Sequence, residues 1–252
     1  MRRNALELLK KWKEDVDRKP LILKGARQVG KTWLMKAFGK ECYEDYFYIN
    51  FDEEEEMASI FKINKDPIRI VELLGMIKGK KIEPEKHLLI FDEIQECPEA
   101  LNTLKYFYEK ANEYHVISAG SLLGTLLAQP KSYPVGKVNI LNLYPFTFDE
   151  FLCAIDSGLY KYYETITAES IIEDIFHNKL LDAYKYYLII GGMPECVSSW
   201  IKYKDCDKVK KIQQELIELY ENDFSEYSKN CYYKENIAIN ANGQYQGVQD
   251  GK

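Results

Sequence analysis

The chain has 252 residues, of which 46% are apolar and 29% charged, a globular composition long enough for one large domain or two modest ones. Its net charge of −6 gives no electrostatic reason to expect a nucleic-acid partner. No apolar run approaches a membrane span, no secretory signal begins the chain and the cysteines form no CxxC pair, so we expect a cytoplasmic protein with reduced thiols and no membrane partner.

A phosphate-binding pattern lies between a predicted strand and a predicted helix near the start of the chain. Residues 4–16 have apolar side chains at helical spacing, and the apolar run 21–23 indicates a buried strand. The strand leads into Gly25-x-x-x-x-Gly30-Lys31-Thr32, the P-loop (Walker A) pattern, and an amphipathic segment, 33–38, follows. The fixed positions would coincide by accident in roughly one such chain in a hundred, so we predict a nucleotide site.

The residue types of this loop suit a bound triphosphate. We expect Gly25 and Gly30 to adopt backbone angles closed to other residues, so that successive N–H groups surround a phosphate. Lys31 would reach the β- and γ-phosphates, and the Thr32 hydroxyl would bind Mg²⁺. The predicted nucleotide-binding residues are the loop and the start of its helix: Gly25, Ala26, Arg27, Gln28, Val29, Gly30, Lys31, Thr32 and Trp33.

An acidic pair follows a later buried strand. Residues 46–51 are predicted as a second strand and 66–77 as a helix. The apolar run 88–91 then indicates a strand buried on both faces, with Asp92 and Glu93 at its carboxyl end, where open α/β sheets bind ligands. In P-loop proteins this is the Walker B pattern, in which Asp92 would hold Mg²⁺ and Glu93 would polarise the attacking water. A surface acid pair at a helix start is the alternative, which the preceding P-loop disfavours.

The remaining segments predict two more strands and then helices. Strands are expected at 114–118 and 138–143. Ser118 and Ser121 are candidate γ-phosphate sensors, although a helix cap explains Ser121 almost as well. Helical patterns follow at 148–155, 169–190, 194–203 and 209–227. We therefore predict an α/β P-loop domain at 1–146, with a parallel sheet flanked by helices, a helical lid-like subdomain at 147–228 and a disordered tail at 229–252.

Several blocks of the chain resemble a family of bacterial and archaeal AAA-type P-loop ATPases that carry a C-terminal domain of the DUF4143 type. The matching blocks are residues 25–32, 90–98, 119–124, 133–138, 144–152 and 191–195. The resemblance covers residues 1–228 and implies an ATP-binding, hydrolysing AAA-like core with a helical subdomain. The family's second domain would extend beyond Ser228, so this chain is expected to lack it.

The arginine content departs from the family pattern. Members often carry Gly-Arg where this chain has Gly136-Lys137, and arginine occurs only at positions 2, 3, 18, 27 and 69. The transition-state cation would have to be Arg27, Arg69 or Lys137, or come from another molecule, which makes a homo-oligomer plausible. Because an arginine finger contributes ~10³–10⁵ in rate, we expect slow hydrolysis by the isolated chain.

The sequence thus favours a Mg²⁺-dependent ATPase that serves an unknown macromolecular partner as a switch or remodelling engine. Lys31 and Glu93 would be catalytic, and Thr32 and Asp92 would hold the metal. The alternative is a nucleotide-gated binding or signalling module with little or no turnover. A P-loop kinase for small molecules would need an arginine-rich lid, which the helical region lacks.

Overall fold

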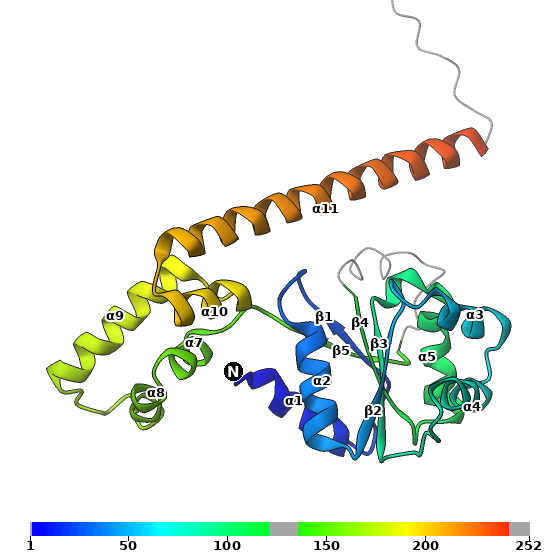
Figure 1. Cartoon of the computed structure of the whole chain (residues 1–252), viewed down its shortest axis with the longest axis horizontal. Helices are drawn as coiled ribbons and strands as arrows, with labels where there is room; N and C mark the ends of the chain where they lie inside the picture. Colours follow the sequence, from blue (N-terminus) through cyan, green and yellow to red (C-terminus); the bar gives the residue numbers. More distant parts are fainter. Residues whose placement is uncertain (1, 121–135, 242–252) are drawn as a thin grey trace, which may run out of the picture.

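A parallel sheet of five strands organises the first part of the molecule (Figure 1). This computed structural model describes residues 2–120 and 136–241, with side chains as far as residue 225. The strand order is β2-β3-β4-β1-β5, and every neighbouring pair is parallel. The strands are β1 Leu21–Lys24, β2 Asp45–Asn50, β3 His87–Asp92, β4 His115–Gly120 and β5 Asn139–Asn142. Parallel strands end at one edge, so the residues that follow β1 and β3 lie at the same edge of the sheet.

Helices cover both faces of this sheet, as the sequence predicted. The helices are α1 Asn4–Glu14 and α2 Lys31–Cys42 on one face, and α3 Glu55–Ile63, α4 Pro67–Lys78 and α5 Pro98–Lys110 on the other. Successive residues of a strand point to opposite faces. Leu88 and Ile90 of β3 accordingly pack with α2, whereas Leu89 and Phe91 pack with α3 to α5. This explains why β3 is apolar without interruption.

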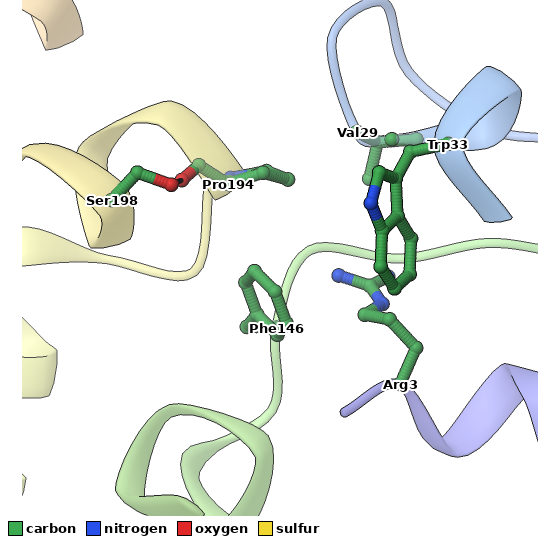
Figure 2. A pocket seen from close by; sticks show the side chains of 7 residues that line it. Arg3, Val29, Trp33, Phe146, Pro194 and Ser198 are labelled. Atoms are coloured by element: carbon green, nitrogen blue, oxygen red, sulfur yellow. Dashed lines mark hydrogen bonds between the residues drawn. The ribbon is translucent and has the colours of Figure 1, made fainter. Parts of the chain in front are cut away.

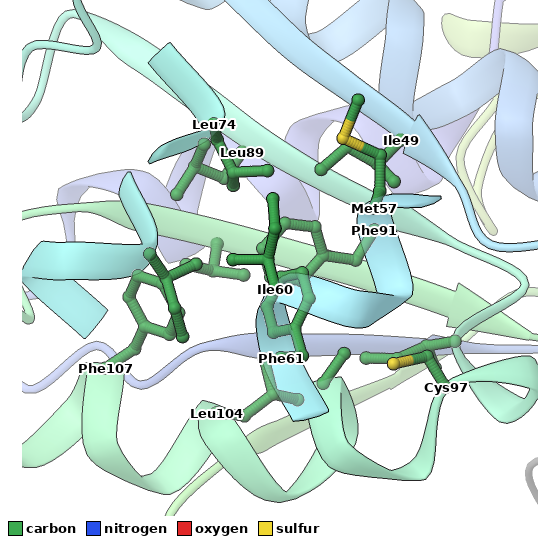
Figure 3. Packing of buried hydrophobic residues seen from close by; sticks show 14 of the residues in the cluster. Ile49, Met57, Ile60, Phe61, Leu74, Leu89, Phe91, Cys97, Leu104 and Phe107 are labelled. Carbon is green, nitrogen blue, oxygen red and sulfur yellow. The ribbon is translucent and has the colours of Figure 1, made fainter. Parts of the chain in front are cut away.

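The core on the α3–α5 face holds β3 in place through aromatic side chains (Figure 3). The Phe91 ring meets the Phe61 ring edge-on at 5.4 Å between centroids and lies 6.3 Å from the Phe107 ring. All three side chains are fully buried. Because Asp92 follows Phe91 directly, this packing fixes the position of the acidic pair at the end of β3.

A helical region follows the sheet. Its helices are α7 Phe148–Ile155, α8 Ser157–Glu164, α9 Asp174–Ile190, α10 Pro194–Tyr203 and α11 Cys206–Ala241. The bounds of α7 and α10 agree with the predicted ones, but α8 was not predicted. Its N-cap is Asp156, whose side chain accepts hydrogen bonds from the N–H groups of Gly158 and Leu159. α11 extends through residues 229–241, where the sequence predicted a disordered tail, and residues 242–252 lie outside the described part of the chain.

The first residues of the chain attach this helical region to the sheet. The Asn4 N–H donates to Glu150 Oε1 at 2.6 Å, and Asn4 Nδ2 donates to Asp149 Oδ2 at 2.7 Å. Arg2 forms an ion pair with Glu164 of α8. Contacts between the chain start and α7 and α8 therefore join parts of the sequence that are far apart. Among the described residues, no helix is both long and apolar enough to cross a membrane.

Candidate nucleotide site

The loop between β1 and α2 combines two kinds of backbone constraint. Gln28 and Gly30 have φ of 62° and 96°, in the left-handed region, and Gly30 is the residue that precedes the first turn of α2. Gly25 is not in that region. A Cβ atom at Gly25 would instead lie 2.4 Å from the carbonyl oxygen of Leu143, at the end of β5. The prediction that backbone angles closed to other residues require glycine is thus supported for Gly30 and wrong for Gly25. Gly25 must be glycine because another part of the backbone approaches it closely.

Lys31, the first residue of α2, is buried against the loop. Its side chain is only 6% exposed, and Nζ donates hydrogen bonds to the carbonyl oxygens of Gly25 and Ala26, both at 2.9 Å. Burial lowers the pKa of this ammonium group, while the carboxylates of Glu93 and Asp92 act to raise it. A cation is therefore held beside the loop backbone, with two acidic groups near enough to influence it.

Asp92, at the end of β3, meets the threonine of the P-loop. Thr32 Oγ1 donates to Asp92 Oδ2 at 2.6 Å, although the two residues are 60 positions apart. Tyr48 of β2 donates its hydroxyl to the same oxygen at 3.0 Å. Burial and the adjacent Asp92 carboxylate raise the pKa of Tyr48, so its hydroxyl stays a donor. Tyr48 is a site residue that the sequence did not reveal, since it was predicted only as part of a strand.

Glu93 lies in a sharp turn at the edge of the sheet. Its φ and ψ are both 47°, a left-handed conformation that is strained for a residue other than glycine. The turn ends β3 and begins the short 3₁₀ helix Ile94–Glu96. Gln95 Nε2 donates to Glu93 Oε2 at 2.6 Å, which fixes the orientation of the carboxylate.

Of the two serines predicted as γ-phosphate sensors, only Ser118 lies in the described part of the chain. Ser118 is fully buried in β4 and donates its hydroxyl to the carbonyl oxygen of Leu21 at 3.2 Å. That hydrogen bond joins β4 to β1 within the sheet, so Ser118 is not assembled with Lys31. Ser121 lies outside the described residues.

The candidate cations Lys137 and Arg69 are also remote from the loop. Lys137 pairs with Glu109 at 3.3 Å and precedes β5, whose Asn139 is in register with the first residue of β1. It therefore lies at the sheet edge opposite the P-loop. Arg69 is an exposed residue of α4 and pairs with Glu72 at 2.9 Å. A role for either at the γ-phosphate stays a prediction.

Arg27 connects the P-loop to the last helix. Its Nη1 lies 2.6 Å from Asp223 Oδ1, and the Tyr220 hydroxyl donates to the Arg27 carbonyl oxygen at 3.0 Å. Both partners belong to α11, which extends from the helical region across the sheet domain (Figure 1). Backbone and side chain of one loop residue are thus both held by α11.

A cavity of about 270 Å³ lies beside the loop, between the sheet domain and α10 (Figure 2). Its lining comes from four separate parts of the chain: Arg3, Val29, Gly30, Trp33, Phe146, Pro194 and Ser198. The glycine break at 191–194 brings α10 here. A Cβ atom at Gly192 would lie 2.2 Å from the Phe146 carbonyl oxygen, so only glycine allows this approach. Arg3 was absent from the predicted site, and no sequence pattern distinguishes it from an ordinary basic terminus.

The oxygen donors at Thr32 and Asp92 fit a magnesium ion. Mg²⁺ prefers hard oxygen ligands and is held by one or two protein groups together with substrate phosphates and water. The described residues contain no cluster of three or more His, Cys, Asp or Glu suited to an all-protein metal site. The pair therefore matches a metal that is bound together with a nucleotide.

Comparison with known proteins identifies the class to which this arrangement belongs. A search of curated proteins gave no significant match. Among solved structures, the chain is similar to the Walker-type ATPase PABY2304 of Pyrococcus abyssi, at 18% identity over 91% of this chain and 76% of that one, with a TM-score of 0.53. The chain is also similar to Drosophila ORC bound to DNA, at 18% identity over 78% of this chain and 58% of that one, with a TM-score of 0.48. A third similar structure is AMPPCP-bound DnaA from Aquifex aeolicus, at 15% identity over 84% of this chain and 65% of that one, with a TM-score of 0.43.

The first of these likenesses shows a shared P-loop fold. A sequence model of the AAA domain also matches residues 17–152, which include the P-loop, the acidic pair and all five strands. That match spans more than half of the chain. By sequence as well as by fold, the chain belongs to the AAA-domain family.

Proposed function

We propose that this protein binds ATP with Mg²⁺ and hydrolyses it slowly, as a switch or remodelling engine for a macromolecular partner. The observation that carries the proposal is the 2.6 Å contact between Thr32 Oγ1 and Asp92 Oδ2, next to the buried ammonium group of Lys31. A hydroxyl, a carboxylate and a cation in this arrangement suit a metal-bound triphosphate.

Each residue then has a chemical role. The loop N–H groups and the positive end of α2 would bind the phosphates, and Lys31 would exchange its two carbonyl partners for phosphate oxygens. Thr32 and Asp92 would hold the metal, which when bound neutralises charge on the phosphates. Glu93 would orient the attacking water and accept its proton, with Gln95 restricting where its carboxylate points.

The nucleoside half would occupy the cavity beside Gly30 and Trp33. This cavity opens next to the end of the phosphate loop, and the half-exposed ring of Trp33 offers a face on which a base can stack.

A nucleotide-gated module with little turnover is the second candidate. Arg27, an arginine within the phosphate loop, is paired with Asp223 rather than free to approach a phosphate. Because α11 holds this loop, a change in loop conformation would be transmitted to α11 without hydrolysis.

The two candidates separate in a turnover assay with wild type, Glu93→Gln and Glu96→Gln, the last being an exposed neighbour that undergoes the same charge change. The ATPase proposal expects Glu93→Gln to keep its ATP affinity and lose turnover about 10²–10⁴-fold, and Glu96→Gln to match wild type. Specific activity that rises with protein concentration would indicate a site completed by a second copy. Tight ATP binding by wild type, with no turnover at any concentration, would contradict the ATPase and leave the gated module.

A further inference from the structure

Arg3 is a buried cation whose hydrogen-bonding capacity is only partly used. The residue directly precedes α1 and is 5% exposed. Its Nη2 donates to the Tyr144 carbonyl oxygen at 2.5 Å, and its Nε lies 3.7 Å from Glu150 Oε1. Its guanidinium carbon lies 4.4 Å from the centre of the Phe146 ring. These contacts hold the side chain in one orientation.

The remaining nitrogen, Nη1, is buried and has no hydrogen-bond partner among the described residues. Buried polar groups are almost always paired, and an unpaired donor on a charged group is especially unfavourable. Burial lowers the pKa of Arg3 while Glu150 opposes this, and a guanidinium stays protonated in any case. The orphan nitrogen is therefore a cationic donor held in place without an acceptor.

The position of Arg3 indicates which acceptor is missing. Arg3 is the charged member of the lining of the cavity beside the P-loop, whose other lining residues are apolar or neutral. Figure 2 shows its guanidinium group beside the Phe146 ring. Nη1 is buried at this wall, so a ligand that reaches it must displace the side chains that cover it.

Gly30, at the end of the phosphate loop, lines the cavity, whereas neither Thr32 nor Asp92 does. A triphosphate bound by Lys31 would place its nucleoside, not its γ-phosphate, near Arg3. We propose that Arg3 is a recognition residue, in which Nη1 donates to an acceptor of the nucleoside, either a ring nitrogen of the base or a ribose oxygen. This inference rests on the proposed function, since it assumes that the P-loop binds a nucleoside triphosphate.

The chain offers a matched control. Arg2 is the adjacent residue and also contacts the helical region, through Tyr160 and Glu164, but its side chain is 48% exposed and does not line the cavity. Arg2→Gln therefore removes the same charge and weakens the same attachment of the chain start. Arg3→Gln tests the proposal directly, and Arg3→Lys tests it with the buried positive charge beside Glu150 retained, in case the glutamine variant does not fold.

The experiment measures the affinity of each variant for Mg²⁺–ATP and for Mg²⁺–tripolyphosphate by calorimetry, after a thermal melt has verified folding. A nucleoside contact predicts that Arg3→Gln and Arg3→Lys weaken ATP binding about 10- to 100-fold and leave tripolyphosphate binding within about twofold. Lysine fails here because one ammonium cannot serve both Tyr144 and a ligand in the geometry of the planar fork. Arg2→Gln should bind both probes as wild type does.

Four results would overturn the proposal. Equal loss of ATP and tripolyphosphate binding would assign Arg3 to the phosphates or to structure alone. An unchanged ATP affinity in folded Arg3→Lys would leave the proposed function standing and remove Arg3 from recognition. Wild type that binds ATP no more tightly than tripolyphosphate would show that the nucleoside contributes nothing, and wild type that binds neither would reject the proposed function as well.

Discussion

Replacing Gly25 by alanine would place a methyl carbon 2.4 Å from the carbonyl oxygen of Leu143, and real contacts of this kind are essentially never shorter than 3.0 Å. The oxygen cannot move alone, because the Leu143 N–H donates to the Lys24 carbonyl at 2.6 Å and so ties the end of β5 to the end of β1. Overpacking of this kind destabilises proteins by about 1–3 kcal/mol. In a chain of this size that corresponds to a melting temperature lower by roughly 2–12 °C.

The assay is thermal and urea unfolding without nucleotide, so that any loss of ATP binding does not contribute. Gly158→Ala is the control, since its methyl would lie 3.3 Å from Asp156 Oδ1, a side-chain oxygen that needs to shift by only a few tenths of an ångström. That variant should be as stable as wild type or slightly more stable, because alanine restricts the unfolded chain. If Gly25→Ala melts within about 1 °C of wild type, the close approach of β5 does not explain the glycine, and the assignment of its role is wrong.

Two further predictions concern single side chains. Tyr48→Phe removes the hydroxyl that donates to Asp92, so the Mg²⁺ concentration for half-maximal ATP binding should rise about 10-fold in a magnesium titration. Tyr46→Phe, on the same strand, should leave that concentration unchanged. Equal behaviour of the two variants would exclude a role for Tyr48 in positioning Asp92. His115 is buried against the Tyr43 hydroxyl, and burial, with smaller effects of Arg18 and Lys13, lowers its pKa from 6.5 to about 3. The unfolded chain then binds a proton that the folded chain does not, so the free energy of unfolding should fall by up to about 1.4 kcal/mol per pH unit as pH drops from 6.5 towards 3. Urea unfolding at several pH values across that range should show that the free energy of unfolding falls less steeply with pH in His115→Gln than in wild type. An equal dependence on pH in the two proteins would exclude His115 as the cause.

The sequence was sufficient for the parts of the fold that are specified locally. Strands buried on both faces are continuous apolar runs, so β1 and β3 were located within about a residue of their bounds. The helix α10 begins with Pro194 after a glycine pair, and its bounds were predicted correctly. Helix α8 was missed because its start depends on one capping residue, Asp156, and because few of its side chains are buried.

The site was predictable only where its residues are contiguous in sequence. The P-loop and the pair Asp92-Glu93 are such runs, and the parallel sheet brings Thr32 and Asp92 together. Arg3 could not be predicted, since its hydrogen-bond partner Tyr144 is 141 positions away and nothing local marks it as buried. The same holds for Asp223, whose contact with Arg27 depends on where α11 crosses the loop. Such contacts follow from tertiary packing, which a single sequence does not display.

The residues that line the cavity are far apart in the chain, so the ribosome adds them at different times during synthesis. Arg3 and the phosphate loop leave the ribosome early, whereas Pro194 and Ser198, which close the cavity, are added after the whole sheet. During synthesis, domains generally fold as units and the N-terminal one folds first. If the cavity holds the nucleoside as proposed, a nascent chain would present the phosphate loop before the complete pocket, and nucleotide would favour the last step of folding because it stabilises the state that it binds. On the proposed function, cellular ATP would thus act as a folding ligand for the docking of α10 against the sheet domain.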